Sequence, residues 1–324
     1  MVNHGEPLPR GPALAFAPQP AKARGMQQDE RSGLLFALAG FAFLSVGDAI
    51  IKTMAGAWPP TGVAALRYTL GAIGLGVLLY RREGPGGFRL PRPGVQLMRG
   101  AGVAFATLSF FSAVFVMPLA TATAIVFTSP MLTAVLAIAM LGEESRKETW
   151  ISLIAGFAGV MLVLRPDPAD FDWSALLPLG SAIGMSFVMI GNRMSAKLAS
   201  PLAMQFSIAS IAAPILVTAA LLGVASGLPE LAIGWPQWHV ALRCAVVAVT
   251  ATTAHWLVYL GTTRAGAATV APMTYVQMLV ATLLGIVLFG DIPDWQTLVG
   301  AGLIIGAGLY LWNAGRLQSA KISP

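Results

Sequence analysis

Three ionisable residues lie inside apolar stretches of this sequence, where a charge is costly. Asp48 and Lys52 fall near the end of the first apolar stretch, and Arg67 falls inside the second. Asp48 and Lys52 are four residues apart, so on a helix they share one face. A charge within a bilayer must be paired or hydrated. The three residues are therefore expected either to lock two helices together as an ion pair or to bind a substrate or coupling ion.

The charged groups of these three residues are suited to binding a charged ligand. Together they carry one net positive charge when all are ionised, which favours an anionic or zwitterionic ligand. The Arg67 guanidinium can hold a planar carboxylate through two parallel hydrogen bonds. The sequence contains no HExxH motif, no paired carboxylates in one helix and no readable nucleophile–histidine–acid set, so we expect no catalytic residue, metal or cofactor.

Aromatic, methionine and amide side chains in other apolar stretches are candidates for the wall of a ligand cavity. His255, Trp256 and Tyr259 follow the spacing of a helical stripe. Such side chains form adaptable apolar walls, and a few polar groups among them orient a ligand. For each residue, packing between helices is the alternative. The remaining candidates are Phe127, Met189, Tyr275 and Gln277.

The elements that position these residues must be membrane-spanning helices. The chain is 56% hydrophobic and only 10% charged, whereas soluble domains carry about 25% charged residues. A bilayer core requires about 20 apolar residues per helix, and backbone groups in lipid must be satisfied within the segment. We therefore predict an all-α membrane protein. The ten expected helices span Gly33–Met54, Thr61–Tyr80, Gln96–Met117, Thr121–Leu141, Thr149–Leu164, Trp173–Asn192, Pro201–Val224, His239–Gly261, Ala267–Phe289 and Trp295–Asn313.

The charges between these helices predict the orientation of the chain. With the amino terminus in the cytoplasm, sixteen of the twenty Lys and Arg residues fall in cytoplasmic segments. The opposite side keeps Arg165 and Arg243, beside several Asp and Glu residues. This asymmetry follows the positive-inside rule and places both termini in the cytoplasm. Because the cations are dispersed between apolar segments, a nucleic-acid partner is not expected.

The two halves of the chain match each other without a gap. Ala120-Thr121, followed by Leu141-Gly142-Glu143, corresponds to Ala268-Thr269, followed by Phe289-Gly290-Asp291. Helices 1–5 therefore repeat as helices 6–10, and because five is odd the second half is inverted. Pro130 and Pro272 lie in the matching segments, where proline favours local unwinding or bending.

These segments resemble a known family. Phe115 to Pro130, ending in Leu141-Gly142-Glu143-Glu144, is similar to the signature of the ten-helix drug/metabolite transporter superfamily in its EamA-type branch. Arg67-Tyr68 fits that branch, and the second half departs from it by having Asp291 where Glu is usual. The stretch around Asp48 and Lys52 also resembles riboflavin and S-adenosylmethionine permeases of this superfamily. The resemblance implies transport or exchange of metabolites, amino acids, nucleotide-like compounds or drugs.

We therefore predict a secondary transporter in a bacterial inner membrane, working by alternating access through a central cavity. Its expected substrate is an amino acid, an organic anion, a nucleotide-like compound or a flavin. A flippase of a lipid-linked sugar is the alternative, and an intramembrane transferase is a weaker one.

The remaining segments are assigned as follows. Residues 1–32 are expected to form a disordered cytoplasmic tail, and residues 315–324 a cytoplasmic carboxyl-terminal tail. Residues 33–165 and 173–314 are the two expected repeats. Gly302 and Gly306 allow close helix packing, within one chain or in a weak homodimer.

Overall fold

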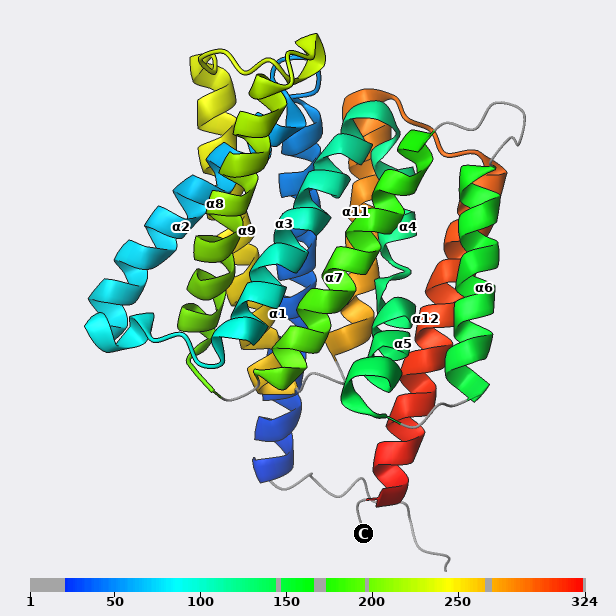
Figure 1. Ribbon diagram of the computed structural model, residues 1–324. Coiled ribbons are helices and arrows are strands. Elements are labelled where there is room, and N and C mark those ends of the chain that lie inside the picture. The colour runs from blue at the N-terminus through cyan, green and yellow to red at the C-terminus, as the bar shows by residue number, and fades with distance from the viewer. Residues whose placement is uncertain (1–20, 144–146, 166–172, 196–197, 266–269, 323–324) are drawn as a thin grey trace, which may run out of the picture.

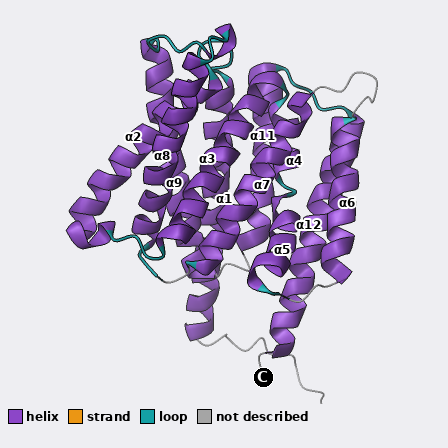
Figure 2. Ribbon diagram, viewed as in Figure 1, coloured by secondary structure: helices purple, strands orange, loops and turns teal. Residues whose placement is uncertain are grey.

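The fold consists of helices throughout the part of the chain that the structure describes. The computed structural model describes residues 21–143, 147–165, 173–195, 198–265 and 270–322, and all regular structure in these ranges is helical (Figure 2). Ten helices are long and apolar enough to cross a membrane. The predicted all-α, multi-pass architecture is confirmed.

The elements of the first half begin before the expected first helix. They are α1 (Ala21–Lys52), α2 (Pro60–Glu83), η1 (Pro85–Phe88), α3 (Pro93–Val116), α4 (Leu119–Val126), α5 (Ser129–Leu141) and α6 (Lys147–Leu164). Residues 21–32, which were expected to belong to a disordered tail, are helical instead. Residues 1–20 of that tail lie outside the described residues.

The second half has the same order of long helices, with short 3-10 turns between them. Its elements are η2 (Trp173–Leu176), α7 (Leu177–Met194), α8 (Pro201–Ala225), η3 (Pro229–Leu231), α9 (Trp238–Ala265), η4 (Ala271–Thr274), α11 (Tyr275–Leu284), η5 (Gly285–Phe289, a π-helical turn) and α12 (Trp295–Ile322). Helix α12 continues through most of the segment that was expected to be a tail.

The long helices run between two faces of the bundle (Figure 1). The start of α1 and the end of α12 lie on one face, which we call the terminal face. The links 53–59, 226–237 and 290–294 lie on the opposite face, which we call the far face. An even number of crossings brings both ends of the chain to one side, as the sequence predicts.

Proline and glycine set several helix boundaries. Pro60, Pro93 and Pro201 each occupy the first turn of their helix, where the missing backbone donor has no cost. Gly142 and Gly290 end α5 and η5 with φ of 67° and 70°. Only glycine adopts this left-handed conformation without strain, so the matching Gly–acid pairs in the sequence are matching helix ends.

The predicted unwinding near Pro130 and Pro272 is confirmed. The helix expected over Thr121–Leu141 is divided into α4 and α5, with a break at residues 127 and 128 directly before Ser129-Pro130. Pro272 lies in the 3-10 turn η4, ahead of α11. Interrupted helices leave backbone groups free for a ligand or a nearby side chain, which lipid alone could not satisfy.

Glycine allows two pairs of helices to pack at close range. Helix α1 packs along α9, and α3 packs along α7. A Cβ added to Gly40 would lie 2.8 Å from the carbonyl oxygen of Ala254, and one added to Gly184 would lie 2.6 Å from that of Gly102. Neither helix pair could approach as closely with a larger residue at the crossing.

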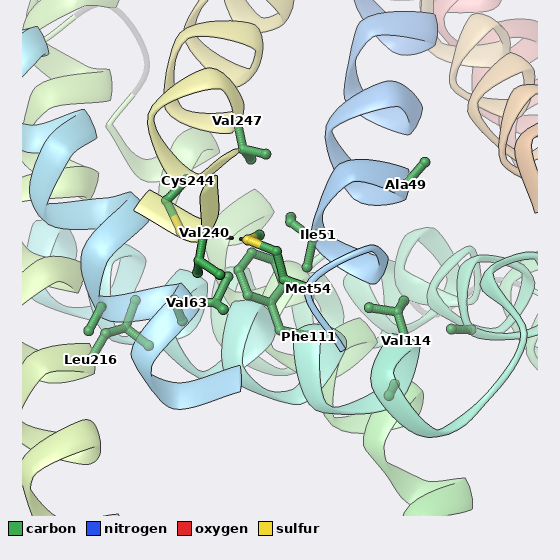
Figure 3. Close-up of a cluster of buried hydrophobic side chains, with 14 of the residues drawn as sticks. Ala49, Ile51, Met54, Val63, Phe111, Val114, Leu216, Val240, Cys244 and Val247 are labelled. Atoms are coloured by element: carbon green, nitrogen blue, oxygen red, sulfur yellow. Dashed lines mark hydrogen bonds between the residues drawn. The ribbon is translucent and has the colours of Figure 1, made fainter. Parts of the chain in front are cut away.

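The largest apolar cluster lies toward the far face and joins α1, α2, α3, α8 and α9 (Figure 3). Met54, Phe111 and Val240 are buried within it, and the Cys244 thiol lies 3.8 Å from the Met54 sulfur. Cys244 is thus the small core residue that its apolar neighbours predict. The cluster packs the end of α1 against the start of α2. These are the helix segments that carry Asp48, Lys52 and Arg67.

Substitution of Gly184 by alanine tests the close crossing of α3 and α7. Helices gain from alanine over glycine, so any loss must come from the crossing itself. We expect Gly184→Ala to lower Tm in detergent by roughly 3–8 °C, since overpacking costs about 1–3 kcal/mol. Gly302→Ala, whose added Cβ meets nothing within 4 Å, is the control and should keep or slightly raise Tm. Equal Tm values for the two variants would contradict the assignment.

Candidate functional site

Asp48 joins α1 to α11 through one glutamine. Nε2 of Gln277 donates a hydrogen bond of 3.1 Å to Oδ2 of Asp48. Oγ of Ser45, one turn earlier on α1, donates a hydrogen bond of 2.6 Å to the Gln277 carbonyl oxygen. The amide side chain of Gln277 is therefore oriented from α1. One carboxylate oxygen of Asp48 makes this contact, and in the described part of the chain no hydrogen bond reaches the other.

Arg67 lies near Asp48 without touching it. Its guanidinium stacks over two rings, with the carbon Cζ 4.7 Å from the Tyr68 centroid and 5.6 Å from that of Phe111. It interacts electrostatically with Asp48 and with His255. Among the described residues, no ion pair within 4.0 Å joins Arg67 to Asp48. The ion pair anticipated between helices 1 and 2 is therefore not formed, and the aromatic rings hold the guanidinium instead.

His255 and Asp48 both keep accessible surface on apolar helices. His255 is exposed and Asp48 is partly exposed, and both interact electrostatically with Arg67. Nδ1 of His255 lies 2.7 Å from the Ala251 carbonyl oxygen; because a carbonyl only accepts, Nδ1 donates. Nε2 of the neutral ring then remains an acceptor. We call the group Asp48, Arg67, His255 and Gln277 the central site.

Lys52 points away from the central site, toward the far face. Its Nζ lies 2.6 Å from Oδ2 of Asp291, donates a hydrogen bond of 3.0 Å to the Met117 carbonyl oxygen, and lies 5.0 Å from the centroid of the Phe289 ring. The sequence did not predict this partner, because Asp291 was assigned to an external loop. The match of Gly290-Asp291 to Gly142-Glu143 was the signal that could have found it.

Phe127 and Tyr275 form an aromatic contact where the interrupted helices meet. Their ring centroids lie 5.5 Å apart at an interplanar angle of 54°. Phe127 is at the break between α4 and α5, and Tyr275 begins α11. Their residue numbers differ by 148, as do those of Glu143 and Asp291. The two rings are thus separated along the sequence by the same interval as these two acidic residues, and the sequence had singled out each of them separately.

The other candidates lie at the edge of this arrangement. Trp256 and Tyr259 pack against each other with centroids 5.7 Å apart. Trp256 is about half exposed and follows Val249, which is also exposed, by two helical turns on α9. Met189 is likewise exposed on α7. The structure therefore brings together Asp48, Arg67, His255 and Gln277, whereas Trp256 and Met189 lie on accessible helix faces.

Arg99 is a buried charge that sequence reasoning missed, because it was assigned to a cytoplasmic segment. It lies on α3 with 3% of its surface exposed. Its Nε donates a hydrogen bond of 2.8 Å to Oδ1 of Asn192, and its Nη1 donates to Gln96 and to Ser207. Among the described residues these partners are all neutral. Arg99 therefore joins α3 to α7 and α8 through neutral acceptors.

A depression of about 200 Å³ on the far face is lined by residues that include Thr121, Arg165, Asp291 and Asp294. Arg165 and Asp294 form an ion pair at its edge. The Arg165 guanidinium, together with the Thr297 backbone N–H and hydroxyl, holds the pKa of Asp294 well below its ordinary value. Asp294 also caps α12, because the Thr297 N–H donates to its carboxylate at 2.9 Å. In the described part of the chain, no group of three or more His, Cys, Asp or Glu residues could hold a metal ion.

Comparison with known proteins identifies the class of this bundle. The model of the EamA-like transporter family matches residues 31–165 and 172–313. The chain therefore belongs to the EamA-like transporter family, and it is a transporter rather than an enzyme. This confirms the resemblance found in the sequence and sets aside the intramembrane transferase.

Several curated relatives carry names that state a substrate. The S-adenosylmethionine uptake transporter of Rickettsia bellii is 27% identical over 71% of this chain and 77% of its own length. The S-adenosylmethionine uptake transporter of Rickettsia prowazekii is 24% identical over 86% of this chain and 92% of its own length. The riboflavin transporter of Rhizobium johnstonii is 27% identical over 86% and 89%. A solved crystal structure covers 91% of this chain and 99% of its own with a TM-score of 0.59 at 20% identity, which supports the fold alone.

Replacing Asp294 by asparagine tests the ion pair on the far face. Because the pKa of Asp294 is lowered by folding, its charge stabilises the fold above the ordinary pKa of about 4 and ceases to do so as pH falls. Asparagine also caps helices well, so the variant isolates the charge. We expect wild type to have a modestly higher Tm than Asp294→Asn at pH 7, and the difference to begin shrinking as pH falls below about 4 and to vanish only below the lowered pKa of the folded state. A difference that grows on acidification would contradict the assignment.

Proposed function

We propose that this protein carries a small zwitterionic metabolite with an aromatic ring system, of the S-adenosylmethionine kind, across a bacterial inner membrane. The observation that carries the proposal is the central site, where one carboxylate, one guanidinium and one imidazole from α1, α2 and α9 interact electrostatically. The names of the relatives support the same class of substrate.

The central site offers one partner for each charged group of such a ligand. The free carboxylate oxygen of Asp48 suits an ammonium or sulfonium group. The Arg67 guanidinium suits a carboxylate, which it can bind through two hydrogen bonds. His255 can accept a hydrogen bond from a ring amine, and the Phe127 and Tyr275 rings offer an apolar surface nearby. A ligand whose charges are all of one sign would leave either the Asp48 carboxylate or the Arg67 guanidinium without a partner.

Transport by alternating access between two inverted repeats is part of this proposal. The helix contacts support it: α1 packs along α9 as α3 packs along α7, and α6 packs along α12. A two-fold axis in the membrane plane would generate this pattern. Arg81 and Arg82 lie in the last turn of α2, and Arg89 follows that helix at the terminal face, which supports a cytoplasmic location for that face.

Uptake into proteoliposomes tests the substrate and the role of Arg67 together. We expect the full chain to accumulate radiolabelled S-adenosylmethionine, and Arg67→Ala to reduce the initial rate at least tenfold. Arg67→Lys should recover only part of the rate, because an ammonium cannot make the bidentate contact. Arg82→Ala is the matched control: an exposed arginine of the same helix, whose loss should leave the rate unchanged.

Riboflavin provides the contrasting measurement, since it carries no zwitterion. Uptake of riboflavin but not S-adenosylmethionine, with a rate indifferent to Arg67→Ala, would refute the assignment of a charged ligand to the central site. It would point instead to the substrate named for the Rhizobium johnstonii relative.

A further inference from the structure

Two serine hydroxyls make matching contacts in the two halves of the bundle. Oγ of Ser45 on α1 donates to the carbonyl oxygen of Gln277 at 2.6 Å. Oγ of Ser186 on α7 lies 3.0 Å from the carbonyl oxygen of Ser129 and 2.7 Å from that of Ala182 in its own helix, so its one proton is shared between them. Both serines are fully buried. In each half, the first long helix therefore touches the interrupted helix of the other half at the same point.

An ion pair follows each serine contact at the same spacing. Seven residues beyond Ser45, Lys52 pairs with Asp291, which lies fourteen residues beyond Gln277. Seven residues beyond Ser186, Arg193 pairs with Glu143 at 3.0 Å, and Glu143 lies fourteen residues beyond Ser129. The two ion pairs are thus equivalent in position, and each joins one half of the chain to the other.

The two ion pairs lie at opposite ends of the bundle. Lys52 and Asp291 are at the ends of α1 and η5, on the far face, whereas Arg193 and Glu143 are at the ends of α7 and α5, on the terminal face (Figure 1). A motion that separates the two halves at one end therefore breaks one pair and leaves the other in place.

The two ion pairs differ in how tightly they are held. The side chains of Lys52 and Asp291 are 13% and 23% exposed, and those of Arg193 and Glu143 are 53% and 46% exposed. The two helix ends that carry the carboxylates have similar backbone hydrogen bonds. The Gly290 and Asp291 N–H groups donate to the Gly285 carbonyl oxygen, and the Gly142 and Glu143 N–H groups donate to the equivalent Ala137 carbonyl oxygen.

We propose that the two ion pairs are the gates of transport: Lys52–Asp291 closes the far face, Arg193–Glu143 closes the terminal face, and one opens as the other tightens. This rests on the proposed function of the bundle as an alternating-access transporter. In this structure the far-face gate is firmly closed and the terminal-face gate is the weaker one. In the opposite state, the two halves exchange their geometries, so that Arg193–Glu143 becomes the tightly held pair and Lys52–Asp291 the more exposed one.

Labelling of one buried cysteine near each gate tests the proposal. Ala122 and Val270 are both buried, occupy equivalent positions 148 residues apart, and lie near the far and terminal ends of their helices. Each is replaced by cysteine in a Cys244→Ala background. The full chain is placed in nanodiscs, where both faces meet solvent, and reacted with a water-soluble maleimide. We expect Asp291→Asn to raise the labelling rate at Ala122→Cys at least fivefold without raising it at Val270→Cys.

The equivalent variant supplies the matched control. Glu143→Gln should raise labelling at Val270→Cys and not at Ala122→Cys. The charge exchange Lys52→Asp with Asp291→Lys should restore slow labelling at Ala122→Cys. Asp291→Asn that raises both reporters or neither, or a charge exchange that leaves labelling fast, would overturn the gate assignment. Neither readout requires a substrate, so a failure of S-adenosylmethionine uptake would refute the proposed function and leave this result standing.

Discussion

A charge placed between lipid-facing helices needs a partner, and here the partners come from other helices. Asp48 binds Gln277, Lys52 binds Asp291, and Arg99 binds Asn192 together with other polar groups. Each contact joins the first half of the chain to the second. Because the energetic cost of leaving such a group alone is large, these contacts fix how the two halves meet. The arrangement of the central site follows from that requirement.

Glycine sets the distance between the closely packed helix pairs. Gly40 and Gly184 let α1 and α3 lie against α9 and α7 at backbone range. On other faces of α1 and α7, the short side chains of Ser45 and Ser186 reach carbonyls of α11 and α5. The interrupted helices supply those carbonyls at Gln277 and Ser129. The closely packed helix pairs thus form the framework of the bundle, and the interrupted helices present backbone carbonyls to neighbouring side chains.

The sequence predicted the framework better than the contacts. Apolar length and charge asymmetry predicted ten helices and a shared side for the two termini, because these depend on composition alone. Asp48, Arg67, His255 and Gln277 were found for the same reason, as polar residues in apolar stretches. The partner of Lys52 was missed because Asp291 lies outside such a stretch, and Arg99 was missed because it lies near a helix start. Pairing between distant segments depends on three-dimensional packing, which spacing along the chain does not encode.

The burial of Arg99 bears on how the protein is assembled in the cell. Asn192 and Ser207, which accept hydrogen bonds from Arg99, belong to α7 and α8 and are synthesised well after α3. Until those helices enter the bilayer, the guanidinium must stay hydrated at the membrane surface, so α3 cannot settle to its final depth. The first five spans therefore cannot reach their final packing until α7 and α8 have inserted. The amino-terminal half produced alone would leave Arg99 without these partners.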